Sequence, residues 1–160
     1  MIFKAANGAE IIEIIEIDEK EAINKYPATN HALVVVKIGK DYLLGWHKWR
    51  SDWETFGGCL EKGEGLRECI VRECKEELGL TDVDFEYLGL VHYYMPPGYF
   101  NPEWHEEYGG LYGITLSTEF ISIIEERRKD KDEIGEILLY SKIEERSSID
   151  EINERLLEFY

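Results

Sequence analysis

The chain has 160 residues, 44% hydrophobic and 12% aromatic, which is enough to bury a core as one domain spanning residues 1–160. Its 18 basic and 34 acidic residues give a formal charge of −16, which disfavours the broad basic face that binds a nucleic-acid polymer. The N-terminus lacks a signal-peptide pattern and no apolar run approaches the roughly 20 residues of a membrane span, so we expect a cytoplasmic protein without membrane contact.

The first third of the chain predicts β-structure. Asn7-Gly8 lies between the apolar segments Phe3 to Ala6 and Glu10 to Ile17, the strongest short-range signal for a β-hairpin. His31 to Ile38 and Asp41 to Trp46 are rich in β-branched and aromatic residues and predict two further strands. The segment Trp53 to Gly58 then leads into a glycine-rich turn.

A helix is predicted from about Gly65 to Leu78, with Gly79 as its stop signal. Its apolar stripe repeats at helical spacing and consists of Leu66, Ile70, Cys74 and Leu78. Cys69 is also expected in the core. The three cysteines include no C-x-x-C pair, which predicts neither a disulfide framework nor a structural zinc site and favours a reducing compartment.

The second half predicts more strands and a final helix. Phe85 to Tyr94, Leu111 to Leu116 and Ile134 to Tyr140 are the strand candidates, with a long aromatic loop at 95–110. The tail from residue 147 predicts a helix capped by Ser147 or Ser148, with Ile149, Ile152 and Leu156 on its apolar side. The order of elements predicts an α/β (α+β) protein, in which helices cover a mixed β-sheet sandwich.

Three glutamates share one side of the predicted central helix. Glu73, Glu76 and Glu77 are three and four residues apart, so their like charges are neighbours and repel one another. A divalent cation would relieve this repulsion, and hard oxygen ligands suit Mg²⁺ or Mn²⁺. From the spacing alone, a solvated acidic face in a glutamate-rich protein is the favoured interpretation.

The whole stretch is more specific than the spacing. Gly58 is followed by five residues and Glu64, then by seven residues and the run Arg72-Glu73-Cys74-Lys75-Glu76-Glu77-Leu78-Gly79-Leu80. This pattern resembles the Nudix hydrolase signature G-x5-E-x7-R-E-U-x-E-E-x-G-U, with U apolar, at every specified position. Phe56 stands where a proline commonly precedes the two glycines. The resemblance implies the Nudix fold of a sheet flanked by helices.

The resemblance also implies a reaction and a set of metal ligands. Family members hydrolyse a diphosphate linkage in nucleoside diphosphate derivatives and use a divalent metal. Glu73 and Glu77 would be the principal ligands, with Glu76 and the Gly57 carbonyl as further ones. Arg72 would pair with Glu64 across the loop and helix and hold the catalytic segment in shape.

The resemblance does not identify which residue is the general base, because family members take it from different positions. Glu73 or Glu76 are candidates within the motif, and Glu133, just before the strand at 134–140, is the preferred candidate outside it. The loop acids Glu103, Glu106 and Glu107 are the remaining alternatives, and for each of these residues an ordinary surface glutamate is the simpler interpretation. We expect His31, His92 and His105 to be structural or solvated.

Substrate contacts are expected from Trp46, Lys48 and Arg50, which combine cations with an aromatic face, and from Gly58 at the loop entering the helix. The same residues also fit an ordinary strand end with partly buried cations. The aromatic loop at 95–110 fits a lid, a base pocket or a homodimer surface.

The preferred substrate is a nucleoside triphosphate, oxidised forms included, cleaved to a monophosphate and pyrophosphate. Nucleotide sugars, ADP-ribose and dinucleoside polyphosphates are alternatives, and so is a non-catalytic nucleotide-sensing module of the same fold. The expected partner is a small nucleotide, and the expected assembly is a monomer or a homodimer.

Overall fold

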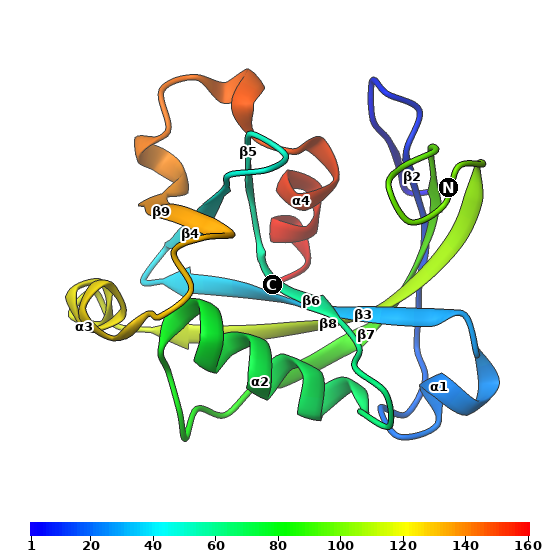
Figure 1. Ribbon diagram of the computed structural model, residues 1–160, viewed down its shortest axis with the longest axis horizontal. Helices are drawn as coiled ribbons and strands as arrows, with labels where there is room; N and C mark the ends of the chain where they lie inside the picture. The colour runs from blue at the N-terminus through cyan, green and yellow to red at the C-terminus, as the bar shows by residue number, and fades with distance from the viewer.

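The computed structural model describes residues 1–160, and all nine of its strands join one mixed sheet (Figure 1). The strands are β1 (Phe3–Lys4), β2 (Glu10–Ile15), β3 (Thr29–Ile38), β4 (Asp41–His47), β5 (Asp52–Glu54), β6 (Phe56–Cys59), β7 (Glu86–Met95), β8 (His105–Leu116) and β9 (Ile134–Leu139). The α-helices are α1 (Ala22–Lys25), α2 (Leu66–Leu78), α3 (Phe120–Arg127) and α4 (Glu151–Leu156), and the 3-10 helices are η1 (Tyr140–Lys142), η2 (Arg146–Ser148) and η3 (Leu157–Phe159).

The order of the main path through the sheet is β1-β2-β7-β8-β3-β4-β5, while β6 pairs with β3 and β9 pairs with β4. The central pair, β3 and β8, is parallel, and its register runs from Thr29↔Tyr108 to Ile38↔Leu116. The other strand pairs in the sheet are antiparallel. The predicted mixed sheet flanked by helices is confirmed.

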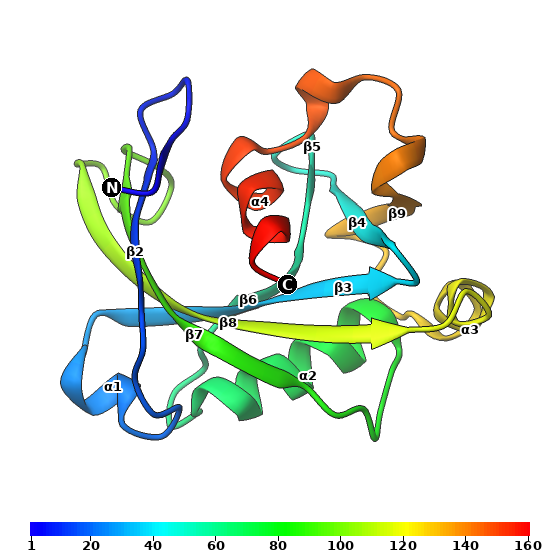
Figure 2. The same ribbon diagram turned by 180° about the vertical axis from the view of Figure 1, so that it is seen from behind.

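The central strand β3 is buried on both faces because each face carries its own apolar core. Val34 and Val36 alternate toward a cluster that contains the apolar stripe of α2. Leu33 and Val35 point the opposite way, toward a cluster that contains Ile152 and Leu156 of α4. Figures 1 and 2 show α2 and α4 on opposite sides of the central strands. The expected stripe of the tail helix is therefore confirmed.

Several boundaries differ from the sequence expectations. Strand β8 begins at His105 rather than residue 111, so the expected loop at 95–110 shrinks to the segment between Met95 and His105. The sequence did not predict this part of the strand because Gly109 and Gly110 are disfavoured in strand interiors. They are needed because side chains pack on the backbone there: a Cβ at Gly109 would collide with the His31 ring.

The cap of α4 is Asp150, not Ser147 or Ser148. Its Oδ1 accepts the Asn153 N–H at 2.8 Å, whereas both serines lie in the 3-10 turn η2. Helices α1 and α3 were not predicted. They have four and eight residues and no side-chain cap, and α3 is held by Ile124, which is fully buried.

Helix α2 and the first hairpin follow their predictions closely. Gly79 ends α2 in the left-handed conformation, at φ 64°, and its N–H donates to the Lys75 carbonyl at 3.0 Å. At the hairpin, Asn7 Oδ1 accepts the Ala9 N–H at 2.9 Å, although β1 is only two residues long. No helix is long and apolar enough to cross a bilayer.

Candidate active site

Two glycines bring strand β6 against helix α2. Gly57 has φ 136°, and a Cβ there would collide with the backbone at Ala32 on the neighbouring strand. A Cβ at Gly58 would collide with the carboxylate of Glu73. The Gly57 N–H donates to Oε1 of Glu77 at 2.7 Å. The glycine pair therefore lets two helix carboxylates reach the strand backbone.

Arg72 ties the glutamates of the motif together. Its guanidinium donates to both oxygens of Glu64, at 2.7 and 2.9 Å, and to Glu73 at 2.9 Å and Glu76 at 3.4 Å. It also donates to the carbonyl of Cys59 at 3.0 Å. These bonds confirm the predicted pairing of Glu64 with Arg72. The hydrogen bonds from Arg72 lower the pKa of Glu64 to about 2.

The pKa values of Glu73 and Glu77, the carboxylates beside the two glycines, are raised rather than lowered. Burial raises the pKa of Glu77 well above its ordinary value, and the charges of Glu73, Glu133 and Asp130 add to that effect, while the bond from Gly57 opposes it. Burial also raises the pKa of Glu73, against the bonds from Arg72. Glu77 is only 2% exposed and forms no ion pair with any basic side chain. Negative charge thus accumulates around Glu77 without a facing cation.

The donor chemistry of this cluster fits a hard divalent cation, since it consists of carboxylate oxygens beside a strand backbone. The side chains nevertheless do not converge as a ready group of three or more ligands. Arg72 donates hydrogen bonds to Glu73 and Glu76, and the Gly57 N–H donates to Glu77. A cation would have to take these oxygens from their present donors.

Glu133 is brought next to the cluster by the pairing of β9 with β4. Its charge is one of the causes that raise the pKa of Glu73 and of Glu77, although burial is the larger cause for both. Oε1 of Glu133 lies 3.2 Å from Nε2 of the buried His47. The structure therefore places this candidate base beside the motif glutamates, from a strand remote in sequence.

The predicted cationic residues divide between two places. Arg50 donates to both oxygens of the buried Glu54, at 2.6 and 2.7 Å, and this contact is the main cause that raises its pKa. The charge of Glu133 raises the pKa of Arg50 further, so Arg50 lies on the side of the carboxylate cluster. Burial and the adjacent Glu54 raise the pKa of Asp52 to about 9. Burial would raise the pKa of Glu54, but the hydrogen bonds from Arg50 outweigh it and the pKa is lowered.

Trp46 and Lys48 lie elsewhere. Trp46 belongs to the core on the α4 face, where it meets Trp53 edge-on with ring centroids 5.5 Å apart. The methylene stem of Lys48 packs on the same side, over the backbone of Gly135. Trp46 also lines a pocket of about 490 Å³ between β9 and the segment that follows it. The structure brings Arg50 to the carboxylates but directs Trp46 to the other face of β4.

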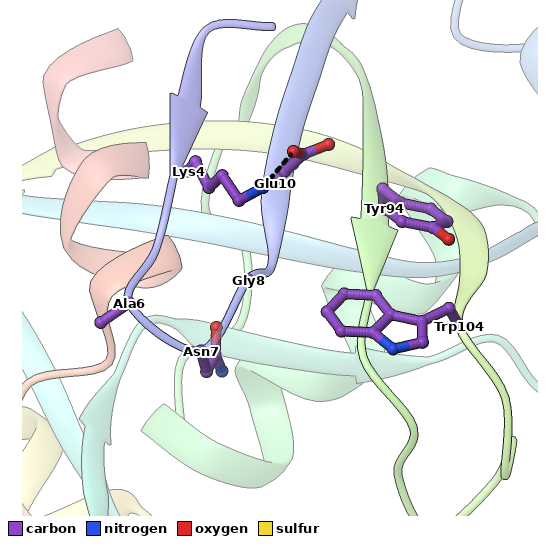
Figure 3. A pocket seen from close by; sticks show the side chains of 7 residues that line it. All are labelled: Lys4, Ala6, Asn7, Gly8, Glu10, Tyr94 and Trp104. Carbon is purple, nitrogen blue, oxygen red and sulfur yellow. Dashed lines mark ion pairs between the residues drawn. The ribbon is translucent and has the colours of Figure 1, made fainter.

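Two of the three loop acids, Glu106 and Glu107, pair with histidines of the β7–β8 hairpin. Glu106 lies 3.0 Å from Nε2 of His92, and Glu107 lies 2.7 Å from Nε2 of His105. At the tip of this hairpin, a pocket of about 430 Å³ opens toward the β1–β2 turn (Figure 3). Its walls are Lys4, Ala6, Asn7, Gly8, Glu10, Tyr94 and Trp104, none of which belongs to the carboxylate cluster.

Three residues near the cluster were not among the candidates from sequence: His47, Glu54 and Asp130. His47 belongs to the cationic run Trp46 to Arg50, and Glu54 belongs to the strand before the two glycines, and neither was singled out within its segment. Asp130 lies in a turn, where its Oδ1 accepts the Glu133 N–H at 3.0 Å. No sequence pattern marked the first two, and their burial, with 1% of His47 and 7% of Glu54 exposed, is established only by the fold.

Comparison with known families agrees with the motif. The model of the NUDIX domain matches residues 27–154, from the start of β3 into α4. The chain belongs to the Nudix family. The resemblance inferred from the sequence motif is confirmed, and the match extends it from the motif to most of the sheet.

Similar proteins support the fold over the whole chain. This Nudix protein superimposes on the Bacillus subtilis pyrophosphohydrolase BsRppH with a TM-score of 0.63 and 19% identity, covering 98% of this chain and 93% of that one. A MutT Nudix hydrolase from Burkholderia pseudomallei matches with a TM-score of 0.59 and 16% identity, over 80% and 94% of the two chains.

In sequence, the NAD-capped RNA hydrolase NudC of Pseudomonas aeruginosa is 31% identical over 81 residues. The matched segment is 46% of this chain and 28% of that relative.

Proposed function

We propose that this Nudix protein is a diphosphatase that hydrolyses a diphosphate linkage in a nucleoside diphosphate derivative, with Mg²⁺ or Mn²⁺ as cofactor. The observation that carries the proposal is the buried carboxylate of Glu77, surrounded by Glu73, Glu133 and Asp130 with no basic side chain opposite. Such an arrangement costs stability in the free protein, and a divalent cation offsets that cost.

The residues of the motif would share the cation. Glu73, Glu76 and Glu77 would hold it through carboxylate oxygens, and the Gly57 carbonyl is the proposed backbone ligand. A bound Mg²⁺ or Mn²⁺ would neutralise phosphate oxygens and lower the pKa of the attacking water. Arg72 would keep Glu64 and the turn before α2 in position, as its present hydrogen bonds do.

In the proposed reaction, a water oxygen forms a bond to one phosphorus of the diphosphate while the bridging P–O bond breaks. Glu133 takes the proton from the water, and the leaving phosphate carries away the electrons of the broken bond. Arg50 and the backbone at Gly58 are the proposed contacts to substrate, whereas the expected contacts from Trp46 and Lys48 are not proposed again, because the two side chains lie away from the carboxylate cluster. The Arg50 side chain is 60% exposed although it is paired with Glu54, so it remains accessible to a substrate.

A nucleoside triphosphate, oxidised forms included, remains the preferred substrate, with a monophosphate and pyrophosphate as products. Nucleotide sugars, ADP-ribose and dinucleoside polyphosphates are the alternatives. The name of the relative NudC adds the cap of an RNA to the substrates worth testing, although a formal charge of −16 disfavours extended contact with the RNA chain.

The test is a hydrolysis screen with Mg²⁺ and with Mn²⁺, with products identified by mass. The panel is GTP, 8-oxo-dGTP, UDP-glucose, ADP-ribose, diadenosine tetraphosphate, 5′-triphosphate RNA and NAD-capped RNA. The expected result is turnover of at least one member that disappears in Glu77→Gln and in the presence of a chelator. Saturable nucleotide binding without turnover of any member would instead identify the non-catalytic sensing module.

A further inference from the structure

His47, a histidine outside the Nudix motif, contacts the carboxylate of Glu133, the proposed general base. The His47 side chain is 2% exposed, and its Nε2 lies 3.2 Å from Oε1 of Glu133, whose side chain is 35% exposed. Glu133 therefore has one oxygen against a buried ring and retains access to solvent. An ordinary surface glutamate has no such fixed contact.

The hydrogen bonds of His47 define its tautomer. The backbone N–H of Arg50 donates to Nδ1 at 3.1 Å, so Nδ1 carries a lone pair and not a proton. The proton of the neutral ring is then on Nε2, which donates to Glu133. In the other tautomer, two N–H groups would face each other at Nδ1 and the carboxylate would lose its donor.

The backbone of Glu133 is fixed as well. Its N–H donates to Oδ1 of Asp130 at 3.0 Å, and its carbonyl accepts the Lys48 N–H at 2.9 Å. The Asp130 N–H in turn donates to the carbonyl of Glu76 at 3.1 Å, which links this turn to α2.

The next residues are held too. Buried Arg128 donates to the carbonyl of Ile134 at 2.8 Å and to that of Gly135 at 2.7 Å. The carboxylate of Glu133 is thereby positioned against both β4 and the helix of the motif.

We propose that His47 is a positioning residue that orients the Glu133 carboxylate toward the attacking water by donating Nε2–H to Oε1. The proposal rests on the proposed function, in which Glu133 is the base. The second oxygen of Glu133 is left to accept the proton. A neutral donor suits this role because it fixes the carboxylate without supplying the full positive charge that would weaken the base.

The kinetic test compares two replacements of His47. Glutamine carries an acceptor and a donor in one side chain and can serve both Arg50 N–H and Glu133, whereas phenylalanine fills the space with neither. With the panel substrate that the wild type hydrolyses fastest, at saturating Mn²⁺, we expect His47→Phe to lower kcat at least about tenfold with KM within about twofold. His47→Gln should restore most of the lost kcat. Melting curves of both variants verify folding.

A double variant separates positioning from general damage. If His47 acts through Glu133, then His47→Phe combined with Glu133→Gln should be no slower than Glu133→Gln alone. Full kcat in His47→Phe, or losses that multiply in the double variant, would overturn the proposal.

The tautomer is measured independently of turnover, by long-range ¹H–¹⁵N NMR of the imidazole rings at neutral pH, with His47→Gln assigning the signal. The Nε2–H tautomer is expected, and a proton on Nδ1 would refute the positioning role even in an active enzyme. If no panel member is hydrolysed while the Nε2–H tautomer is present, the proposed function fails and the positioning role fails with it, although the hydrogen bond stands.

Discussion

At the scale of single residues, the motif contains glutamates of two opposite kinds. Arg72 stabilises the ionised form of Glu64, while burial and like charges destabilise the ionised form of Glu77. The two residues are chemically identical and 13 positions apart, so only their neighbours distinguish them. Their replacement by glutamine should therefore change stability in opposite directions.

Glu77→Gln should stabilise the metal-free protein at neutral pH. The raised pKa of Glu77 means that the native state loses stability as pH rises above about 4.3, the ordinary glutamate value, and glutamine removes this loss. The Gly57 N–H keeps an acceptor in the amide oxygen. Urea unfolding at pH 7 and pH 4 measures the effect, and the gain should vanish at the lower pH. Turnover should fall by about 100-fold or more.

Glu64→Gln should destabilise the protein at neutral pH, because the amide cannot replace the charged bidentate contact with Arg72. The contribution of Glu64 is present above about pH 4.3 and is lost as pH falls toward its native pKa of about 2. The same unfolding series should show the deficit shrinking in acid. Turnover should fall less than in Glu77→Gln, and the reverse order of activities would contradict this division of roles.

At the scale of elements, the site depends on four segments that meet: the strand β6, the helix α2, the turn before β9 and the end of β4. Strand β6 and α2 are adjacent in sequence and follow from the motif. The turn before β9 reaches them only because β9 pairs with β4, with Ile134 opposite His47. In the β7–β8 hairpin, in contrast, Glu106 and Glu107 pair with histidines of the hairpin itself.

This arrangement predicts different kinetics for the two groups of candidate bases. Glu133→Gln should lower kcat by about 100-fold with little change in metal affinity, the scale expected for losing a general base. The triple replacement of Glu103, Glu106 and Glu107 by glutamine should chiefly affect KM. Steady-state kinetics on both variants at saturating Mn²⁺ make the comparison. Full activity in Glu133→Gln together with collapse in the loop variant would move the base to the hairpin.

At the scale of the whole molecule, one sheet separates two apolar cores. The acidic residues behind the formal charge of −16 lie in different environments. Most acidic side chains are solvated, but those around Glu77 are partly buried and their like charges repel one another. The folded protein should therefore gain stability from any cation that binds there, since the unfolded chain has no such site.

Millimolar Mg²⁺ or Mn²⁺ should raise the melting temperature. A cation at 100 times its dissociation constant contributes about 2.7 kcal/mol, which corresponds to several degrees for a chain of this length. Thermal melts with and without metal measure the shift, and Glu77→Gln is the matched control that should lose most of it. An unchanged melting temperature in the wild type, with and without nucleotide, would contradict the metal site.

The sequence by itself determined the local features of this protein. The boundaries of α2, its stop at Gly79 and the pairing of Glu64 with Arg72 follow from helical spacing, glycine conformation and charge within one short segment. The Asn7-Gly8 hairpin and the alternation along β3 are equally local. These features depend on residues close in the chain, whose geometry is nearly independent of the rest.

The tertiary structure decided what depends on distant segments. The extension of β8 through Gly109 and the helices α1 and α3 are stabilised by packing that no local pattern displays. The burial of Glu77 and the contact between His47 and Glu133, 86 residues apart, arise only when β9 pairs with β4 and α2 packs on the sheet. Burial and long-range pairing set the chemistry of a carboxylate, and the sequence specifies neither until the chain is folded.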